Sequence, residues 1–150
     1  MNAIDIIVPV KNEVANVGEL CRRIDASLKS ARISYGIIFV VDKSTDGTLN
    51  VVHQLADKYP ITVHQKTGQP GKAESILEGA QLATSEYLVM IDGDLQYPPE
   101  AIPKMFALRD QFALVVANRT TADYGPLRHL ASRINHIVFN RILLGLAFDV

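Results

Sequence analysis

Cysteine, excess positive charge and long apolar runs are all scarce in this sequence. Cys21 is the only cysteine among 150 residues, so no internal disulfide can form and we expect a reducing compartment. The net charge of −1 argues against a broad basic face, so we expect no nucleic-acid partner. No uncharged apolar run reaches the ~18 to 20 residues that span a bilayer, and no signal peptide is visible. We therefore expect a cytoplasmic protein, with peripheral contact at the cytoplasmic face of a membrane as an alternative.

The composition that is present is typical of one compact domain. Hydrophobic residues make up 48% and charged residues 21%, which is enough apolar material for a real core. Cys21 lies among Leu20, Ile24 and Leu28 in a helical pattern, so we interpret it as a core residue.

Short apolar strands alternate with helices along most of the chain. Strands are expected at residues 4–10, 35–41, 61–64, 87–91 and 112–117. Helices are expected over 16–29 with Asn16 as the cap, from Thr48, after Lys72 and after Pro99. This alternation predicts an α/β fold with a mostly parallel sheet and helices on both faces.

Carboxylates follow two of these strands directly. Asp42 ends the second strand, and the fourth, which we expect to be buried, runs into Asp92-Gly93-Asp94. Two acids one residue apart repel each other unless a cation compensates them. Because ligands bind at the carboxyl ends of parallel strands, the simplest partner is Mg²⁺ or Mn²⁺ carrying a phosphate.

Four segments together resemble a known family. They are Pro9 to Glu13, Val41 to Thr48, Gly71-Lys72-Ala73 with Gly79, and Asp92 to Glu100. In this order and spacing, over residues 4 to about 120, they resemble the family 2 glycosyltransferases of the GT-A fold, a Rossmann-like architecture. Within that family the resemblance is to the polyprenyl-phosphate sugar transferases of the dolichyl- and undecaprenyl-phosphate type.

The resemblance implies a donor, a metal and an acceptor. The reaction would be inverting transfer of a sugar from a UDP- or GDP-linked donor, with Mg²⁺ or Mn²⁺ bridging the diphosphate. The acceptor would be a lipid phosphate at a membrane surface, which implies a role in the cell envelope. Asp92 and Asp94 would hold the metal, and Asp94 would be catalytic. The donor-binding residues implied are Pro9, Lys11, Glu13, Val40, Asp42, Asp92, Gly93, Gln96 and Arg119, the last neutralising the diphosphate.

The sequence departs from the family pattern in two places. Lys11 stands where the family usually has an aromatic residue, and Val41-Asp42-Lys43 stands where it usually has two aspartates and a glycine. The later acceptor-side motif would lie beyond Val150, so we expect the chain to end before the natural protein does. The domain prediction is one GT-A domain over 1–150, with a donor-binding half over 1–120 and the start of the acceptor side over 121–150.

Two other functions remain open from the sequence. One is a transferase of the same family with a saccharide acceptor, and the other is a catalytically incomplete nucleotide-binding module. The segment Leu127 to Phe148 has a helical apolar pattern with interspersed arginines, which fits a core-facing helix or a basic amphipathic helix on a membrane surface.

Several residues have simpler interpretations. Asp46 precedes Gly47-Thr48 and is interpreted as a turn or cap residue. Gly71-Lys72 lacks the spacing of a nucleotide triphosphatase loop, although Lys72 could touch the donor phosphates. The four histidines lack metal-ligand spacing and are interpreted as surface or core residues: His53, His64, His129 and His136. For Tyr124 and Gly125 two interpretations stay open, a mobile loop over the donor or no role at the donor.

Overall fold

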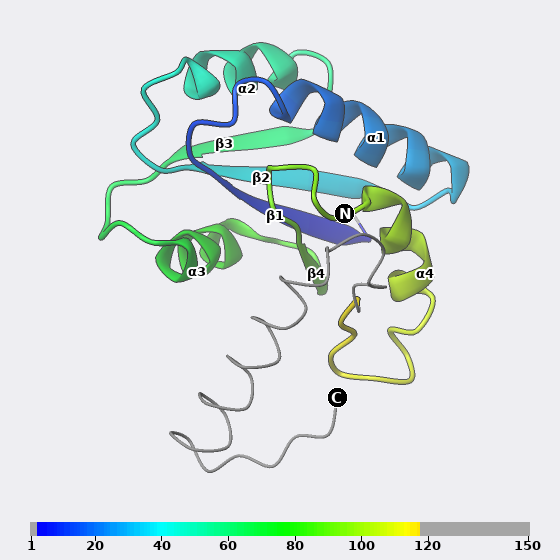
Figure 1. Ribbon diagram of the computed structural model, residues 1–150. Helices are drawn as coiled ribbons and strands as arrows, with labels where there is room; N and C mark the ends of the chain where they lie inside the picture. The colour runs from blue at the N-terminus through cyan, green and yellow to red at the C-terminus, as the bar shows by residue number, and fades with distance from the viewer. Residues whose placement is uncertain (1–2, 118–150) are drawn as a thin grey trace, which may run out of the picture. The chain divides into compact units, whose positions relative to one another are not determined.

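Four parallel strands form the centre of the computed structural model, which describes residues 3–117. The strands are β1 (Ile4–Val10), β2 (Tyr35–Val41), β3 (Ile61–Gln65) and β4 (Tyr87–Met90), in the spatial order β3-β2-β1-β4 (Figure 1). β1 pairs with β2 on one side and with β4 on the other, and all pairs are parallel. The predicted α/β class and parallel sheet are therefore confirmed.

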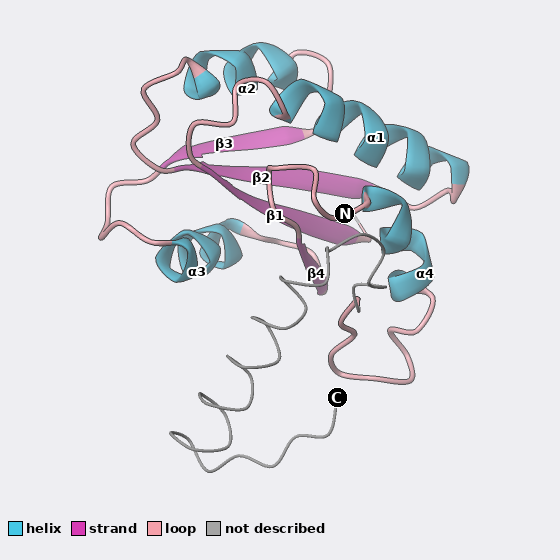
Figure 2. Ribbon diagram, viewed as in Figure 1, coloured by secondary structure: helices cyan, strands magenta, loops and turns pink. Residues whose placement is uncertain are grey.

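Helices cover both faces of this sheet. Helices α1 (Val17–Ser30) and α2 (Thr48–Ala56) lie on one face and α3 (Lys72–Leu82) on the other (Figures 1 and 2). The short helices η1 (Pro99–Ala101) and α4 (Ile102–Phe106) pack beside α1. The chain moves outward from β1 through β2 to β3 and then returns to β1's other side, so the strand order reverses between β1 and β4. Open α/β sheets bind ligands at this point.

The core lies between the sheet and helices α1 and α2. Alternate residues of β1 and β2 point into it, because side chains of a strand alternate between its two faces. On β2 these residues are Ile37, Phe39 and Val41, and all are almost fully buried. Helix α1 contributes the opposite wall through Val17, Leu20, Cys21, Ile24 and Leu28. Cys21 is 0% exposed and burial raises the pKa of its thiol to about 12, which confirms it as a core residue.

A buried carboxylate fastens β4 to the sheet at its amino end. Asp5 on β1 is 4% exposed and accepts hydrogen bonds from the backbone N–H groups of Thr84 and Ser85, at 2.8 and 2.9 Å. Such bonds compensate the cost of burying the carboxylate. They also fix the turn that leads from α3 into β4.

Two strand predictions at this side of the sheet were wrong. The fourth strand was expected to be buried, but within the described chain it is an edge strand, with Leu88 48% and Met90 55% exposed. The expected strand at 112–117 is a loop, and Leu114 is 80% exposed. Apolar, β-branched sequence makes a strand only when a neighbouring strand pairs with it, and residues 3–117 offer none.

One helix detail differs from expectation, and another shows how α3 packs. Asn16 takes the N-cap position of α1, but its side chain makes no capping bond and donates to Glu13 Oε2 instead, at 2.6 Å. On α3 the apolar residue Leu77 is 58% exposed, whereas the buried positions are Ser75 and Gly79. Small residues face the sheet there because α3 packs very close to it. No helix in residues 3–117 has the length and apolarity needed to cross a bilayer.

The close packing of α3 generates a stability prediction. A Cβ built on Gly79 would lie 2.6 Å from Ile7 Cγ2 and 3.1 Å from Val40 Cγ2. The Gly79→Ala variant gains about 1 kcal/mol of helix propensity but overpacks the interface by about 1–3 kcal/mol. We therefore expect the free energy of unfolding, measured in urea, to fall by up to about 2 kcal/mol.

The matched control is Gly18→Ala on α1, where an added Cβ meets no atom within 4 Å. This variant should leave the unfolding free energy unchanged or raise it by up to about 1 kcal/mol. Equal effects at Gly18 and Gly79 would contradict the packing argument.

Candidate nucleotide-sugar site

A pocket of about 350 Å³ opens at the carboxyl ends of β1, β2 and β4. This volume lies within the usual range of about 300–1,000 Å³ for small-molecule sites. Acidic and basic side chains both line it, which suits a ligand that carries phosphate and a counter-cation. The lining residues are Pro9, Val10, Lys11, Glu13, Asp42, Pro70, Gly71, Lys72, Ser75, Asp92, Gly93 and Asp94.

Gly93 allows the loop after β4 to lie directly against the end of β1. A Cβ at this position would be 2.5 Å from Val10 Cγ1, closer than real Cβ contacts come. Any larger residue between the two aspartates would push this loop away from β1. The Asp-Gly-Asp pattern therefore has a steric reason as well as an electrostatic one.

The two aspartates of this loop have different partners. Asp92 Oδ1 forms an ion pair with Lys72 Nζ at 2.5 Å, across the pocket from the start of α3. Asp94 Oδ1 accepts the backbone N–H of Gln96 at 3.0 Å. The intervening Leu95 has a φ of 60°, a left-handed conformation that is strained in residues other than glycine. Such strain persists where surrounding structure holds it, and here it accompanies the turn that presents Asp94.

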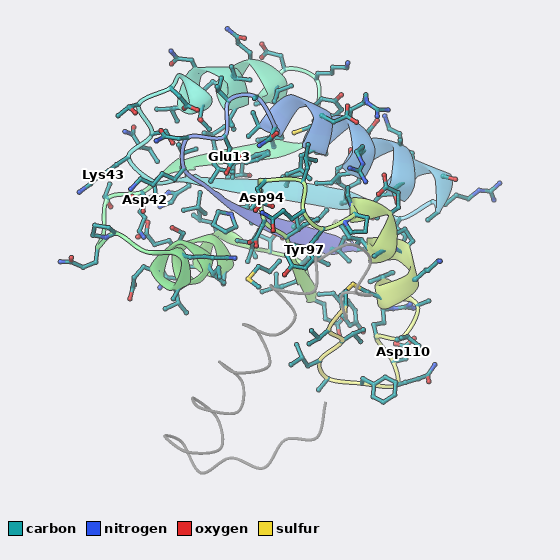
Figure 3. All side chains as sticks on the ribbon, viewed as in Figure 1. Glu13, Asp42, Lys43, Asp94, Tyr97 and Asp110 are labelled. Atoms are coloured by element: carbon teal, nitrogen blue, oxygen red, sulfur yellow. The ribbon has the colours of Figure 1, made fainter. Side chains whose placement is uncertain are left out.

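Asp42 stands at the opposite wall of the pocket. Its residue exposure is 8%, and its Oδ2 accepts the backbone N–H of Gly71 at 3.3 Å. The buried ammonium of Lys66 lies 3.8 Å from the same oxygen. Glu13, Asp42 and Asp94 all lie around this end of the sheet, whereas Asp110 lies apart on the loop after α4 (Figure 3).

The loops after β1 and β2 are joined by side-chain to backbone bonds. Asn12 N–H donates to Ser44 Oγ at 3.0 Å, and Thr45 N–H donates to Asn12 Oδ1 at 2.8 Å. The Asp46 carboxylate accepts hydrogen bonds from the N–H and hydroxyl groups of Thr48 and from Val14 N–H. These bonds lower the pKa of the Asp46 carboxyl group, and the bond from the Thr48 hydroxyl contributes most. The turn interpretation of Asp46 is confirmed, because its carboxylate accepts Thr48 N–H ahead of α2, whose N-cap residue is Gly47. Its other bond reaches the loop after β1.

The donor set of the pocket fits a divalent cation that arrives with its ligand. In the described part of the chain no group of three or more His, Cys, Asp or Glu side chains could hold a metal ion. Asp92 and Asp94 supply two carboxylates, and Mg²⁺ characteristically takes one or two carboxylates, several waters and substrate phosphates. Among residues 3–117, Asp92 and Asp94 therefore fit a cation that takes its remaining ligands from a diphosphate and water.

Most of the site residues that the sequence predicts come together here. Seven line the pocket: Pro9, Lys11, Glu13, Asp42, Asp92, Gly93 and Asp94. Val40 does not, because it is 0% exposed beneath α3. Gln96 is exposed outside the lining, and its backbone supports Asp94. Arg119, Tyr124, Gly125, His129, His136 and the segment 127–148 lie outside the described residues.

The sequence reasoning named Gly71 and Lys72 but missed the other residues of this wall of the pocket and the lysine that supports it. Pro70, Gly71 and Ser75 line the pocket at the start of α3, and Lys66 anchors that wall from beneath. The sequence did hold a signal for Lys66, because Asp42 and Lys66 carry opposite charges and each directly follows a strand. It could be used only with the register of β2 and β3 known.

Other charged groups in the described chain have local roles. His64 Nε2 lies 2.7 Å from Glu78 Oε2 and joins β3 to α3, and His53 is exposed on α2. A wider hollow of about 530 Å³ runs along α1, but Arg22 and Arg23 in its wall are already paired with Glu19 and Glu100. Both arginines of this hollow thus have carboxylate partners, and the hollow contains none of the acids that follow the strands.

Comparisons with known proteins agree with this geometry. Residues 5–145 match the family described as Glycosyl transferase family 2. Dolichol-phosphate mannosyltransferase of Pyrococcus furiosus is 34% identical over 117 residues, which cover 77% of this chain and 33% of that protein. Undecaprenyl-phosphate 4-deoxy-4-formamido-L-arabinose transferase of Pseudomonas savastanoi is 28% identical over 141 residues, covering 92% of this chain and 42% of that protein.

A solved structure extends the likeness to the fold. The mannosyltransferase PcManGT from Pyrobaculum calidifontis, in complex with GDP-Man and Mn²⁺, matches with a TM-score of 0.63 and 27% identity. The match covers 73% of this chain and 33% of PcManGT, so the chain spans less than half the length of the proteins it matches here. With its parallel sheet, its acids at the strand ends and these similarities, the chain belongs to glycosyl transferase family 2, has the GT-A fold and is related to the polyprenyl-phosphate sugar transferases.

Proposed function

We propose that this chain is the donor-binding part of an inverting, metal-dependent glycosyltransferase that moves a sugar from a nucleoside diphosphate sugar to a polyprenyl phosphate. The observation that carries the proposal is one pocket at the carboxyl ends of β1, β2 and β4 that brings together Asp42, Asp92, Asp94 and Lys72. Relatives named for mannose and arabinose transfer support the reaction class.

The charges of the pocket suit the two ends of such a donor. Asp42, on the β2 side, has hydrogen bonds only to its Oδ2 within residues 3–117, so its Oδ1 can accept from a ribose hydroxyl or a base N–H. On the β4 side, Asp92 and Asp94 face Lys72, with Lys11 also in the lining. The diphosphate would lie between these carboxylates and cations.

The proposed reaction exchanges one bond at the sugar for another. A phosphate oxygen of the acceptor attacks the anomeric carbon while the bond to the diphosphate oxygen breaks, and the electron pair leaves with the nucleoside diphosphate. A divalent cation held by Asp92 and Asp94 would supply charge stabilisation for the leaving diphosphate. Lys72 would support the same charge by moving from Asp92 to a phosphate oxygen.

A phosphate acceptor also agrees with the pocket lining among residues 3–117, which holds no histidine that could act as a general base. The second pKa of a phosphate monoester is about 6, so it is largely dianionic at neutral pH and needs no general base. Neither described histidine, His53 or His64, lines the pocket. The names of the relatives, dolichol-phosphate and undecaprenyl-phosphate transferases, support this acceptor class.

The function is tested in two steps. Calorimetry with UDP, GDP and their sugars, with and without Mn²⁺, should show binding of one nucleotide that Mn²⁺ strengthens. Transfer of labelled sugar to a polyprenyl phosphate in vesicles, with NMR of the anomeric centre, should then show an inverted product. Transfer to a saccharide instead would reject the lipid acceptor, and binding without any turnover would identify a nucleotide-binding module.

The metal assignment predicts a selective defect in Asp94→Ala. Loss of this carboxylate should weaken nucleotide-sugar binding in Mn²⁺ by about tenfold or more, which is about 1.4 kcal/mol, and leave metal-free binding unchanged. Calorimetry with and without Mn²⁺ measures both. Asp110→Ala is the matched control, because that acid is 68% exposed and lies on the loop after α4. Unchanged affinity in Asp94→Ala would reject the assignment.

The nucleoside assignment predicts that Asp42→Asn weakens nucleotide binding independently of the metal. Asparagine keeps an acceptor for Gly71 N–H but removes the charge, so nucleotide affinity should fall by several-fold whether or not metal is present. Hydrogen bonds to charged groups contribute about 1.5–3 kcal/mol, which sets the upper limit of the loss. A defect seen only in Mn²⁺ would place Asp42 with the metal ligands instead.

The Lys72–Asp92 pair predicts effects of opposite sign in Lys72→Met. Without the ammonium, Asp92 no longer has a competing cation, so Mn²⁺ alone should bind more tightly. The pair is partly exposed, at 56% and 24%, so a gain of at most about fivefold is expected from about 0.2–1 kcal/mol. Metal-free nucleotide binding should weaken in the same variant.

Mn²⁺ binding is measured by electron paramagnetic resonance of the free ion, with Lys104→Met on the exposed side of α4 as the control. Weaker Mn²⁺ binding in Lys72→Met would show that the lysine does not compete with the metal.

A further inference from the structure

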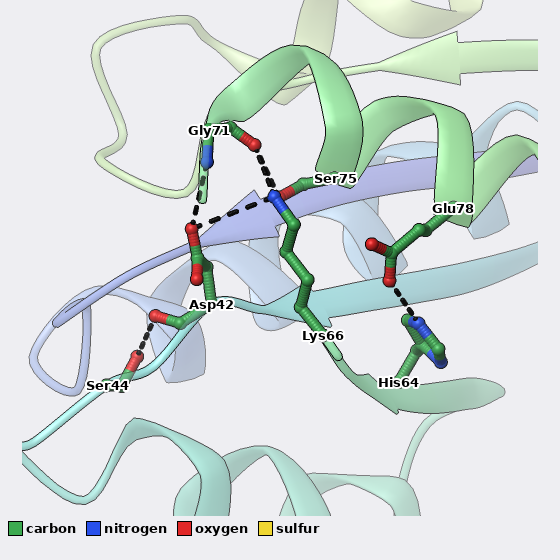
Figure 4. A network of polar contacts seen from close by, with 7 residues as sticks. All are labelled: Asp42, Ser44, His64, Lys66, Gly71, Ser75 and Glu78. Atoms are coloured by element: carbon green, nitrogen blue, oxygen red, sulfur yellow. Dashed lines mark hydrogen bonds and ion pairs between the residues drawn. The ribbon is translucent and has the colours of Figure 1, made fainter. Parts of the chain in front are cut away.

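The side chain of Lys66, directly after β3, is fully buried at 0% exposure. A buried ammonium costs several kcal/mol unless each of its protons finds a partner. Lys66 Nζ donates to Gly71 O at 2.6 Å and to Ser75 Oγ at 3.1 Å, and it lies 3.8 Å from Asp42 Oδ2 (Figure 4). Two hydrogen bonds and one longer ion pair thus compensate the buried ammonium group.

The parallel register of β2 and β3 is what brings Lys66 to Asp42. Val41 is paired with Gln65, and Lys66 N–H donates to Val41 O at 3.0 Å. Asp42 and Lys66 therefore leave neighbouring strand ends side by side. Their charges compensate each other on the inner side of the pocket.

This contact sets the orientation of the Asp42 carboxylate. Oδ2 is held by the Lys66 ammonium and by Gly71 N–H, while Oδ1 has no hydrogen-bond partner within residues 3–117. Asp42 lines the pocket but Lys66 does not. The lysine thereby leaves one carboxylate oxygen for a ligand without reaching the ligand itself.

The same ammonium also fixes the turn at the start of α3. Gly71 has a φ of 138°, a conformation that strongly favours glycine. Its carbonyl accepts from both Lys66 Nζ and Ser75 Oγ, at 2.6 and 3.0 Å. Pro70, Gly71 and Lys72 of this turn line the pocket. One buried cation therefore holds two walls of the pocket in place.

We propose that Lys66 is a positioning residue of the nucleotide site, which acts by holding the Asp42 carboxylate and the Gly71 turn rather than by touching the ligand. The inference rests on the proposed function, because it takes Asp42 to be the group that meets the nucleoside. It adds that nucleotide affinity depends on a side chain outside the pocket.

A double-mutant cycle between Lys66 and Asp42 tests this role. The probe is UDP or GDP without metal, whichever the wild-type chain binds, measured by calorimetry on the full chain. Lys66→Met should weaken binding about tenfold, or about 1.4 kcal/mol, in the wild-type background. In the Asp42→Asn background the loss should be clearly smaller, about two- to threefold, because only the part that acts through the Gly71 turn remains and coupled sites are not additive.

Three outcomes would overturn the proposal. Unchanged affinity in Lys66→Met would show that the ammonium is not needed. Equal losses in both backgrounds would show that Lys66 acts independently of Asp42, as a general packing residue would. If the wild-type chain binds neither UDP nor GDP, the proposed function fails and this inference fails with it, a result separate from the other two.

Ser75→Ala keeps the test decisive if Lys66→Met does not fold. It removes one partner of the ammonium and leaves the charge in place, so we expect a two- to fivefold loss of affinity that is smaller in the Asp42→Asn background. Thermal unfolding of each variant confirms that the fold is intact. Unchanged affinity in folded Ser75→Ala would then overturn the proposal, and Lys104→Met serves as the control for loss of a lysine.

Discussion

The parallel pairing of β1 with a strand on each side is the constraint on which the site depends. β1 pairs with β2 along its whole length and with β4 over its first half. Parallel strands bring their carboxyl ends to one edge, so the segments after Val10, Val41 and Met90 meet there although they are far apart in the chain. Gly79 and Gly93 serve this arrangement, because each occupies a place where a Cβ would collide with a β1 side chain.

The acids that gather at one edge of the sheet repel each other, and two lysines compensate their charges in different ways. Lys66 compensates Asp42 from a fully buried position and donates hydrogen bonds to two further oxygens. Lys72 compensates Asp92 from a side chain that is 56% exposed. A buried pair is costly to break, whereas an exposed pair contributes little and exchanges easily. The wall at Asp42 is thus fixed by a buried pair, whereas the exposed pair at Asp92 is one that a ligand could replace.

Much of the fold follows from local sequence. The bounds of β1 and β2 agree with prediction because each is a continuous apolar run that ends in polar turn residues. Helix α1 agrees because its apolar residues repeat with the helical period. The predictions failed where long-range contacts decide the outcome. Residues 112–117 have strand-like sequence but no neighbouring strand in the described chain, and β4 is an edge strand there although its sequence reads as buried.

The sequence by itself determined the α/β class, the family and the acids at the strand ends, since strand periodicity, turn residues and charge are all local properties. Only the tertiary structure decided which groups those acids meet. Lys66 is 24 residues from Asp42, and Lys72 is 20 residues from Asp92, yet each pair is in contact. Register and helix packing set these distances, and both arise from contacts between segments remote in the chain. For the same reason Val40 is buried beneath α3, whereas Asp42, two residues further along the chain, reaches the pocket.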